Sequence, residues 1–137
     1  MTDQLFFVLQ PKPKGVHLIT SEVMRHLEGR LPEKGLMNLF VQHTSCALTL
    51  NENADRDVRL DMADILSRLF PEDDPSLRHT LEGADDMPAH AVSALVGQSV
   101  TIPIERHRLA LGTWQGLWLV ESRYDGGPRR MVATILS

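Results

Sequence analysis

The order of strand-like and helix-like segments along the chain most constrains its fold. Short segments rich in β-branched and other apolar residues, bounded by Pro, Gly or polar turn residues, are typical of β-strands. These segments span residues 4–10, 15–19, 36–43, 46–50, 99–104, 109–121 and 131–136. Apolar residues at helical spacing predict helices over about 21–31, 55–69 and 86–96. Because strands and helices do not alternate regularly, we predict a single α+β domain with a mainly antiparallel sheet.

The composition is that of a globular domain. A chain of 137 residues, 42% of them apolar, can bury one hydrophobic core without disulfides. No apolar run reaches the roughly 18 residues that span a bilayer, and the first residues lack the pattern of a secretory signal. The single cysteine, Cys46, cannot form an internal disulfide, which favours a reducing compartment. We therefore expect a cytoplasmic protein without a membrane partner.

Acidic residues gather in the middle of the chain. Residues 52–86 contain eleven Asp or Glu and four Arg, in a chain of net charge −4. Part of this acidity is typical of a helix start, because Asn53 or Asp55 can cap the helix at 55–69 and Asp57 complements its dipole. No extended basic surface is present, so we expect no nucleic-acid partner.

The segment from His79 to His90 has the densest set of groups suited to metal binding or acid/base chemistry. Between these two histidines lie the carboxylates of Glu82, Asp85 and Asp86. Asp86 and Pro88 are typical of a helix start. At 100° per residue, His90 lies opposite the apolar face of this helix. We therefore expect His90 to face solvent or a cavity and not the core.

His43 lies where one predicted strand ends and the chain turns into the next. It is either a site residue at the rim of the sheet or a histidine hydrogen-bonded within the turn. Ser45 and Cys46 follow closely, which raises the hypothesis of a nucleophile. A simpler interpretation is that Ser45 satisfies the backbone of the turn and Cys46 is a small core residue.

His43, His79 and His90 are the candidate metal ligands. Neutral imidazoles, often with a carboxylate and a water, bind Zn²⁺ or similar ions in open catalytic sites. No two of these histidines have the i, i+4 spacing of a helical zinc motif, so such a site depends on the fold. Without a metal, a histidine beside one of the neighbouring carboxylates could act as a general base.

Two further pairs are candidates for buried or ligand-binding roles. Trp114 and Trp118 are four residues apart, which predicts one face of a strand and a place in the core or a subunit interface. Arg129 and Arg130 follow a Gly-Gly-Pro turn. Strand alternation directs one of them inward, where it needs an anionic partner such as Glu121 or a ligand phosphate.

Five motifs occur in order over most of the chain. They are His43-Thr44-Ser45, Asn51-Glu52-Asn53 with Asp55, the run from Glu82 to His90, Gly112-Thr113-Trp114-Gln115-Gly116, and Gly126-Gly127 with Arg129-Arg130. Together they resemble the YjbQ-like family, and the match extends from about Leu5 to Ser137.

The resemblance implies a compact α+β domain that assembles as a homotrimer. It also implies weak activity as a secondary thiamine-phosphate synthase, which joins a hydroxymethylpyrimidine diphosphate to a thiazole phosphate and releases pyrophosphate. The implied cofactor is a divalent metal such as zinc, held by His43, His79 and His90. The implied catalytic residues are Glu82, Asp85 and Glu121. The implied substrate-binding residues are Asn51, Trp114, Gln115 and Arg129, with Arg129 at the phosphate end.

The sequence departs from the family pattern at three positions. His107 lies in a hairpin where Gly is usual, and Ala54 stands where some relatives have Cys. Ser122 stands where others have His, so a mechanism that requires that histidine does not apply to this chain.

Three functions are compatible with these residues. The first is a metal-assisted enzyme acting on a small phosphorylated or heterocyclic substrate, thiamine-phosphate synthase being the reaction that the resemblance suggests. The second is a metal-dependent hydrolase or other enzyme of unassigned substrate. The third is a non-catalytic trimeric protein that binds a metal or a small molecule. A glycine-rich phosphate loop of the P-loop kind is absent.

Overall fold

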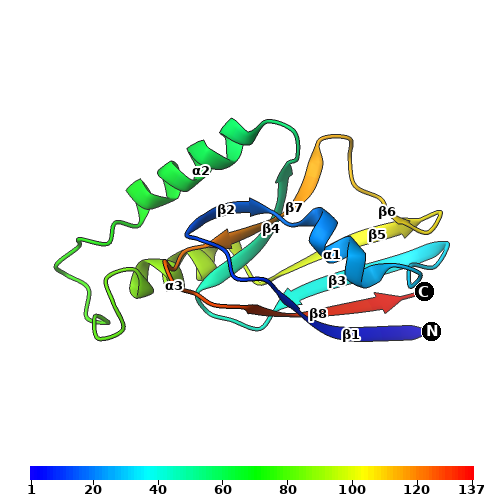
Figure 1. Cartoon of the computed structure of the whole chain (residues 1–137), viewed down its shortest axis with the longest axis horizontal. Coiled ribbons are helices and arrows are strands. Elements are labelled where there is room, and N and C mark those ends of the chain that lie inside the picture. The colour runs from blue at the N-terminus through cyan, green and yellow to red at the C-terminus, as the bar shows by residue number, and fades with distance from the viewer.

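Two antiparallel sheets form the centre of the structure, a computed structural model that describes residues 1–137 (Figure 1). The larger sheet has the order β1-β8-β3-β5-β6 and the smaller the order β2-β7-β4. The strands are β1 (Thr2–Leu9), β2 (Gly15–Leu18), β3 (Lys34–Val41), β4 (Cys46–Glu52), β5 (Ser99–Glu105), β6 (Arg108–Leu109), β7 (Gln115–Glu121) and β8 (Arg129–Leu136). With three helices, this arrangement confirms the predicted α+β class.

The main core lies between the two sheets. Alternate residues of each strand point inward, as the period of two along a strand requires. The larger sheet contributes Phe7, Leu9, Met37, Leu39, Val41, Ile102, Ile104, Met131, Ala133 and Ile135, and the smaller contributes Cys46, Leu48, Leu117 and Leu119. Helix α1 (Thr20–Leu27) adds Val23 and Leu27.

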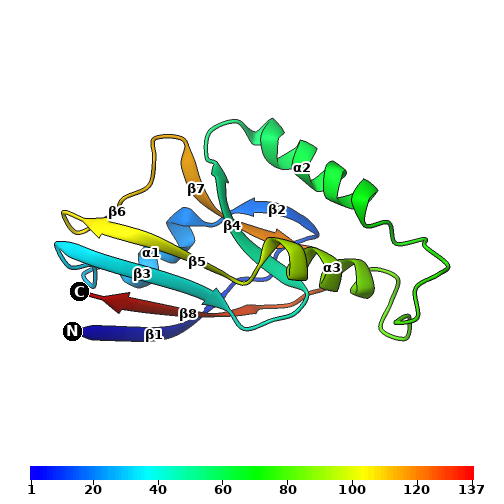
Figure 2. The same ribbon diagram turned by 180° about the vertical axis from the view of Figure 1, so that it is seen from behind.

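Helix α3 (Asp86–Val96) covers the outer face of the smaller sheet. Val92 packs there with Ala47 of β4 and Val120 of β7. The helix ends at Gly97, whose φ of 105° is in the left-handed region that favours glycine. This packing fixes the start of α3 beside the connections that precede β4 and follow β7, as Figure 2 shows from behind.

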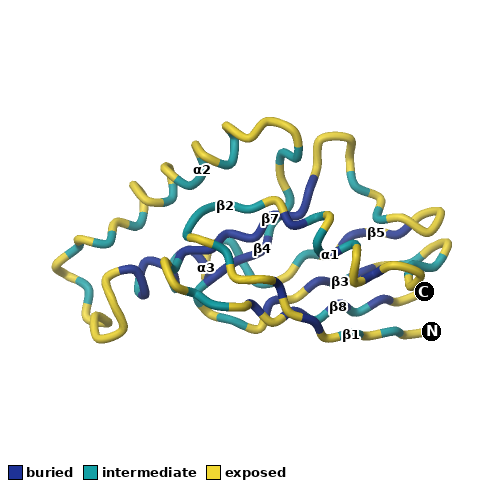
Figure 3. The backbone as a smooth tube through the Cα atoms, in the orientation of Figure 1, coloured by how far each residue is buried: buried dark blue, intermediate teal, exposed yellow.

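Helix α2 (Arg56–Leu69) begins as predicted, because the Asp55 side chain accepts a hydrogen bond from the Asp57 backbone N–H. It buries no residue, however (Figure 3). Its apolar residues at helical spacing are divided: Val58, Met62 and Leu66 are half-buried, and Leu66 packs beside the smaller core cluster, whereas Ile65 and Leu69 are exposed. The protein's own sheets therefore cover the apolar side of α2 only in part.

The outer face of the larger sheet is also uncovered and carries apolar residues. Phe6, Val132 and Phe40 lie side by side across β1, β8 and β3, and both phenylalanines are exposed. The next row along is polar but uncharged, with Gln4 bonded to Thr134. The exposed Arg130, opposite Val8, borders the apolar row on its other side. Adjacent exposed phenylalanines are unusual on a sheet face that meets only water.

Helix α1 has no side-chain cap, because the Thr20 hydroxyl instead accepts a hydrogen bond from the Leu117 backbone N–H of β7 and thereby ties the helix to the smaller sheet. The prediction for the two tryptophans was wrong. Trp114 and Trp118 do not share a strand face, because β7 begins only at Gln115. Trp118 is buried and donates to the Glu52 carbonyl, while Trp114 is exposed in the preceding turn.

None of the three helices is both long enough and apolar enough to cross a bilayer.

Candidate functional site

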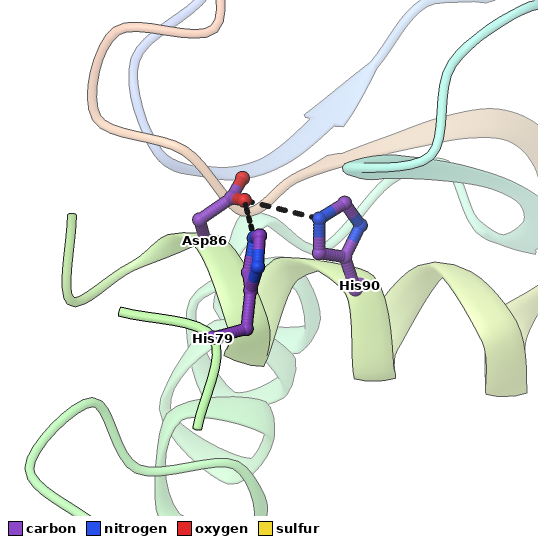
Figure 4. A group of neighbouring side chains, drawn as sticks. All are labelled: His79, Asp86 and His90. Atoms are coloured by element: carbon purple, nitrogen blue, oxygen red, sulfur yellow. Dashed lines mark hydrogen bonds and ion pairs between the residues drawn. The ribbon is translucent and has the colours of Figure 1, made fainter. Parts of the chain in front are cut away.

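The buried carboxylate of Asp86 joins the two histidines of the 79–90 segment. His79 Nε2 lies 2.6 Å and His90 Nε2 3.0 Å from the same oxygen, Oδ2, and the two rings converge on it (Figure 4). Asp86 and His90 are four residues apart on the first turns of α3, so they share one face of the helix. His79 reaches them from the connection between α2 and α3.

The second nitrogen of His90 fixes the state of its ring. Nδ1 lies 2.8 Å from the Thr44 carbonyl oxygen, which can only accept, so Nδ1 carries a proton. In a neutral ring, Nε2 is then an acceptor that faces a carboxylate oxygen at 3.0 Å. Two lone pairs at this distance require a positive species between them or on the ring, which is either a second proton or a bound cation.

Arg123 forms ion pairs with both neighbouring carboxylates, Asp85 and Asp86. Its guanidinium donates through Nη1 to Asp86 Oδ1 and through Nε to Asp85 Oδ2, and Nη2 donates to the Glu82 carbonyl. The Tyr124 backbone N–H also donates to Asp85. Asp85 therefore positions Arg123 and does not contact either histidine. Burial alone would raise the pKa of Asp85, but these hydrogen bonds and the charge of Arg123 hold it below its usual value, so Asp85 is a weak base.

The chemistry of the donor set suits a divalent transition metal. His79, Asp86 and His90 each offer one ligand atom, and these atoms lie within 4.8 Å of one another. Two imidazoles with one carboxylate are a common ligand set for zinc, manganese and iron. The hydrogen bond from His90 Nδ1 to the Thr44 carbonyl is the outer contact that usually orients a metal-bound histidine. Both histidines are partly exposed, so a further coordination position could face solvent or substrate.

His43, the third predicted metal ligand, lies outside this group of ligand atoms. Its Nε2 accepts a hydrogen bond of 2.8 Å from the Arg130 backbone N–H. Burial, and then the charges of Arg129 and Arg130, lower the pKa of His43, so the ring is neutral at neutral pH. His43 and His90 nevertheless line the same surface cleft of about 540 Å³, between α3 and the connection from β3 to β4.

Glu121 and Arg129 form a buried ion pair between the two sheets. Two guanidinium nitrogens of Arg129, Nε and Nη2, donate to the Glu121 carboxylate, and Nη1 and Nη2 donate to the hydroxyl and carbonyl oxygens of Ser45. Gly126 lies so close that an added Cβ would be 2.5 Å from Glu121 Oε1. The prediction that one arginine points inward to Glu121 is confirmed. A role of Arg129 as phosphate ligand stays a prediction, and it would require this pair to open.

The nucleophile hypothesis has no support in the geometry. The Ser45 hydroxyl accepts from Arg129, which is the positioning role expected for a turn residue. Cys46 is fully buried, and burial raises the pKa of its thiol to about 12, so the thiolate is not populated at neutral pH.

The remaining predicted site residues lie elsewhere or lack contacts to the cluster. Asn51 and Gln115 lie at the end of β4 and β7 opposite to Cys46 and Glu121, about 20 Å along the strands. Trp114 is in the turn beside them, and their side chains bond locally, Asn51 to the Glu52 N–H and Gln115 to the Gly112 N–H. The exposed Glu82 approaches the cluster through its backbone only.

Sequence reasoning missed Asp86 and Arg123. Asp86 was assigned to the helix start, which it does form, but its side chain is the centre of the cluster and is 1% exposed. The i, i+4 spacing of Asp86 and His90 was a usable signal, which a search for paired histidines alone overlooks. Arg123 had no signal, because only the fold brings the end of β7 beside α3.

Comparison with known proteins identifies the family. The sequence profile described as "UPF0047 protein YjbQ-like" matches residues 5–137. UPF0047 protein YjbQ of Salmonella typhimurium is 48% identical over 133 residues, which cover 96% of each chain. Its counterpart from Escherichia coli O157:H7 is 45% identical over 134 residues, again 96% of each chain. The chain belongs to the YjbQ-like family. The predicted resemblance is thereby confirmed.

Solved structures of YjbQ-like proteins have the same fold. A conserved hypothetical protein of Thermus thermophilus, 37% identical, superposes with a TM-score of 0.81 over 97% of this chain and 99% of its own. A protein of Sulfolobus solfataricus described as YbjQ-like and of unknown function has a TM-score of 0.86 at 22% identity, over 100% and 98% of the two chains. These relatives establish the family and the fold, and their descriptions assign no reaction.

We expect Asp86→Asn to lower the free energy of unfolding at pH 7 by about 2 kcal/mol, because Arg123 loses a charged acceptor and the two imidazoles lose their negatively charged neighbour. Burial by itself would raise the pKa of Asp86, but the hydrogen bond from His79 and the charges of His90 and Arg123 hold it below its usual value. The stabilisation is therefore complete above about pH 4 and is lost as the pH falls through the folded-state pKa.

Urea denaturation at pH 7 and pH 3 measures this effect. The loss of stability between the two pH values should be smaller in Asp86→Asn than in the wild type, without vanishing, because the pKa of Asp85 is also lowered. Asp61→Asn, at an exposed position on α2, is the control and should follow the wild type. Equal acid sensitivity in Asp86→Asn and the wild type would contradict the assignment.

Proposed function

We propose that the protein is a metal-assisted enzyme that acts on a small phosphorylated substrate beside His79, Asp86 and His90. The observation that supports this proposal best is the state of His90. Its Nδ1–H is committed to the Thr44 carbonyl, so its Nε2 lone pair meets the Asp86 carboxylate at 3.0 Å. A divalent cation satisfies both groups at once, and it also suits the third donor, His79.

Two of the proposed metal ligands, Asp86 and His90, are held in position by other groups of the protein. Arg123 fixes Asp86 through Oδ1 and leaves Oδ2 directed at the two histidines. The Thr44 carbonyl fixes the ring of His90. Ligands held by such outer contacts need little reorganisation when an ion or substrate binds. A bound divalent cation would supply a Lewis acid that neutralises charge developing on a phosphate leaving group.

The cleft lined by His43 and His90 is the proposed substrate site. Its volume of about 540 Å³ suits a small molecule, and Gln42, Thr44, Ser93 and Gln98 provide polar groups along it. The neutral His43 is held by the Arg130 backbone and can contact a substrate without carrying a charge.

For the specific reaction we propose thiamine-phosphate synthesis, on the basis of the family resemblance. The pyrimidine diphosphate would present its diphosphate to the cation site, and the bond to the thiazole phosphate would form as pyrophosphate leaves. The acidic and histidine-rich character of the site is compatible with this role because a divalent cation binds both carboxylates and diphosphates.

We expect purified wild-type protein to bind about one divalent transition-metal ion per chain, measured by elemental mass spectrometry after dialysis. Asp86→Asn and His90→Gln should weaken binding by at least about 100-fold, because each removes a ligand. His26→Gln, which removes an imidazole from α1, is the matched control and should bind like the wild type. If the purified wild type contains no metal and takes up none when metal is resupplied, the proposed metal site is ruled out.

The synthase reaction is tested by incubating wild-type protein with hydroxymethylpyrimidine diphosphate and thiazole phosphate and measuring thiamine phosphate. We expect turnover that depends on added metal and falls at least about 100-fold in His90→Ala. His26→Gln should retain the wild-type rate. If the wild type is no faster than His90→Ala while its metal binding is intact, the synthase proposal is wrong. The hydrolase and the non-catalytic binding protein are then the candidates to test.

We also propose that the protein assembles as a homotrimer, as the resemblance implies. The exposed Phe6 and Phe40 on the outer face of the larger sheet support an interface there, and Trp118 cannot contribute because it is buried. Light scattering should give three times the chain mass of 15.4 kDa. Phe40→Lys should reduce the trimer fraction, while Leu81→Lys, at a fully exposed leucine of the α2–α3 connection, should not. A wild-type monomer at micromolar concentration would refute the trimer.

A further inference from the structure

A basic cleft lies between α2 and β2. It has a volume of about 450 Å³ and is lined by Lys12, Val16, His17, Leu18, Arg56, Arg59 and Leu60. Three of these side chains carry a positive charge and none is a carboxylate, although the net charge of the chain is −4. The cleft shares no residue with the site formed by His79, Asp86 and His90.

Arg59 is the residue that points to a ligand. Its Nη1 is buried and has no hydrogen-bond partner, and it is the only buried side-chain nitrogen or oxygen of the structure in that state. A buried guanidinium nitrogen without an acceptor is costly, so such groups are normally paired. Arg59 is half-buried near the start of α2, which packs against β2, and it lines the cleft.

The other cations increase the local positive charge. Arg56 also makes no hydrogen bond or ion pair, whereas Lys12 is held by Glu22 at 2.7 Å. Two arginines are thus left without a carboxylate in the first turns of α2, where the helix dipole disfavours cations. His17 adds a ring whose Nε2 donates to the Pro13 carbonyl at 2.6 Å, which fixes its orientation at the edge of the cleft.

We propose that this cleft binds the phosphate group of a small organic molecule. The planar guanidinium fork of Arg59 matches a tetrahedral oxyanion, which accepts two parallel hydrogen bonds, and Arg56 supplies a second charge. Val16, Leu18 and Leu60 form the apolar part of the cleft and suit the organic body of the ligand. An acceptor from the ligand satisfies the Arg59 nitrogen that the protein leaves unpaired.

The proposal goes beyond the metal-assisted enzyme, because it concerns a second site with opposite charge. A phosphate bound here contacts none of His79, Asp86 and His90, which are on α3 and the connection that precedes it. Failure of metal binding at the first site therefore leaves this proposal standing, and the reverse also holds.

Isothermal titration of inorganic phosphate into the full-length protein, at constant ionic strength in chloride, tests the proposal. We expect saturable binding by the wild type and a rise of about 3 °C in the unfolding midpoint at saturating phosphate. Arg59→Gln should weaken phosphate binding about tenfold or more, and Arg56→Gln should weaken it by a smaller factor. Circular dichroism confirms that each variant is folded, and the exposed Arg56 provides a variant that does not disturb the α2 packing.

Two controls separate this cleft from other sources of binding. Arg68→Gln removes an arginine from the other end of α2 and should bind phosphate like the wild type. Acetate at the same ionic strength should compete weakly. The proposal is overturned if the wild type binds no phosphate, if Arg59→Gln binds as tightly as the wild type, or if acetate binds equally well.

Discussion

A single buried carboxylate, that of Asp86, holds together the segments that form the candidate site. One of its oxygens accepts a hydrogen bond from Arg123 after β7, and the other lies against His79 in the α2–α3 connection and His90 on its own helix. His90 in turn contacts Thr44 before β4. Segments far apart in sequence therefore meet around one negative charge, which stays ionised because its cationic partners outweigh the cost of burial. A neutral side chain of the same size cannot replace it.

The chain contains two arginine–carboxylate systems of similar composition but different use. In the pair of Glu121 and Arg129, both groups are buried and Arg129 also donates to Ser45. These groups bond to one another, and the pair joins the two sheets. In the system of Asp86 and Arg123, one carboxylate oxygen remains directed at two partly exposed histidines. A fully buried ion pair stabilises or specifies a fold, whereas an ionised oxygen that faces solvent-accessible imidazoles is available for a ligand. Glu121 and Asp86 are both acids paired with an arginine, and the exposure of their partners distinguishes the structural role of Glu121 from the proposed site role of Asp86.

The sequence was sufficient for the fold class and for one wall of the site. Alternation located most strands, the cap at Asp55 located α2, and helical geometry placed His90 off the core face. It was insufficient where contacts depend on which segments meet in space. The apolar residues of α2 obey helical periodicity, yet the helix turns Arg59 and Leu66 towards the protein and leaves Ile65 exposed. Likewise His43 and Arg123 each lie two residues beyond a strand end, and only the fold shows that Arg123, and not His43, contacts Asp86.

The two proposed sites show why net charge is a poor guide to function in this protein. An overall charge of −4 and an acidic middle suggest a preference for cations, which the cluster around Asp86 fits. The same acidic segment nevertheless supplies Arg56 and Arg59 to a cleft without carboxylates, because the exposed Asp57 and Asp61 point from other sides of α2. Binding depends on the charges within a few ångströms of the ligand, since water and salt screen the rest. One helix can therefore be acidic towards solvent and basic towards the sheet it covers.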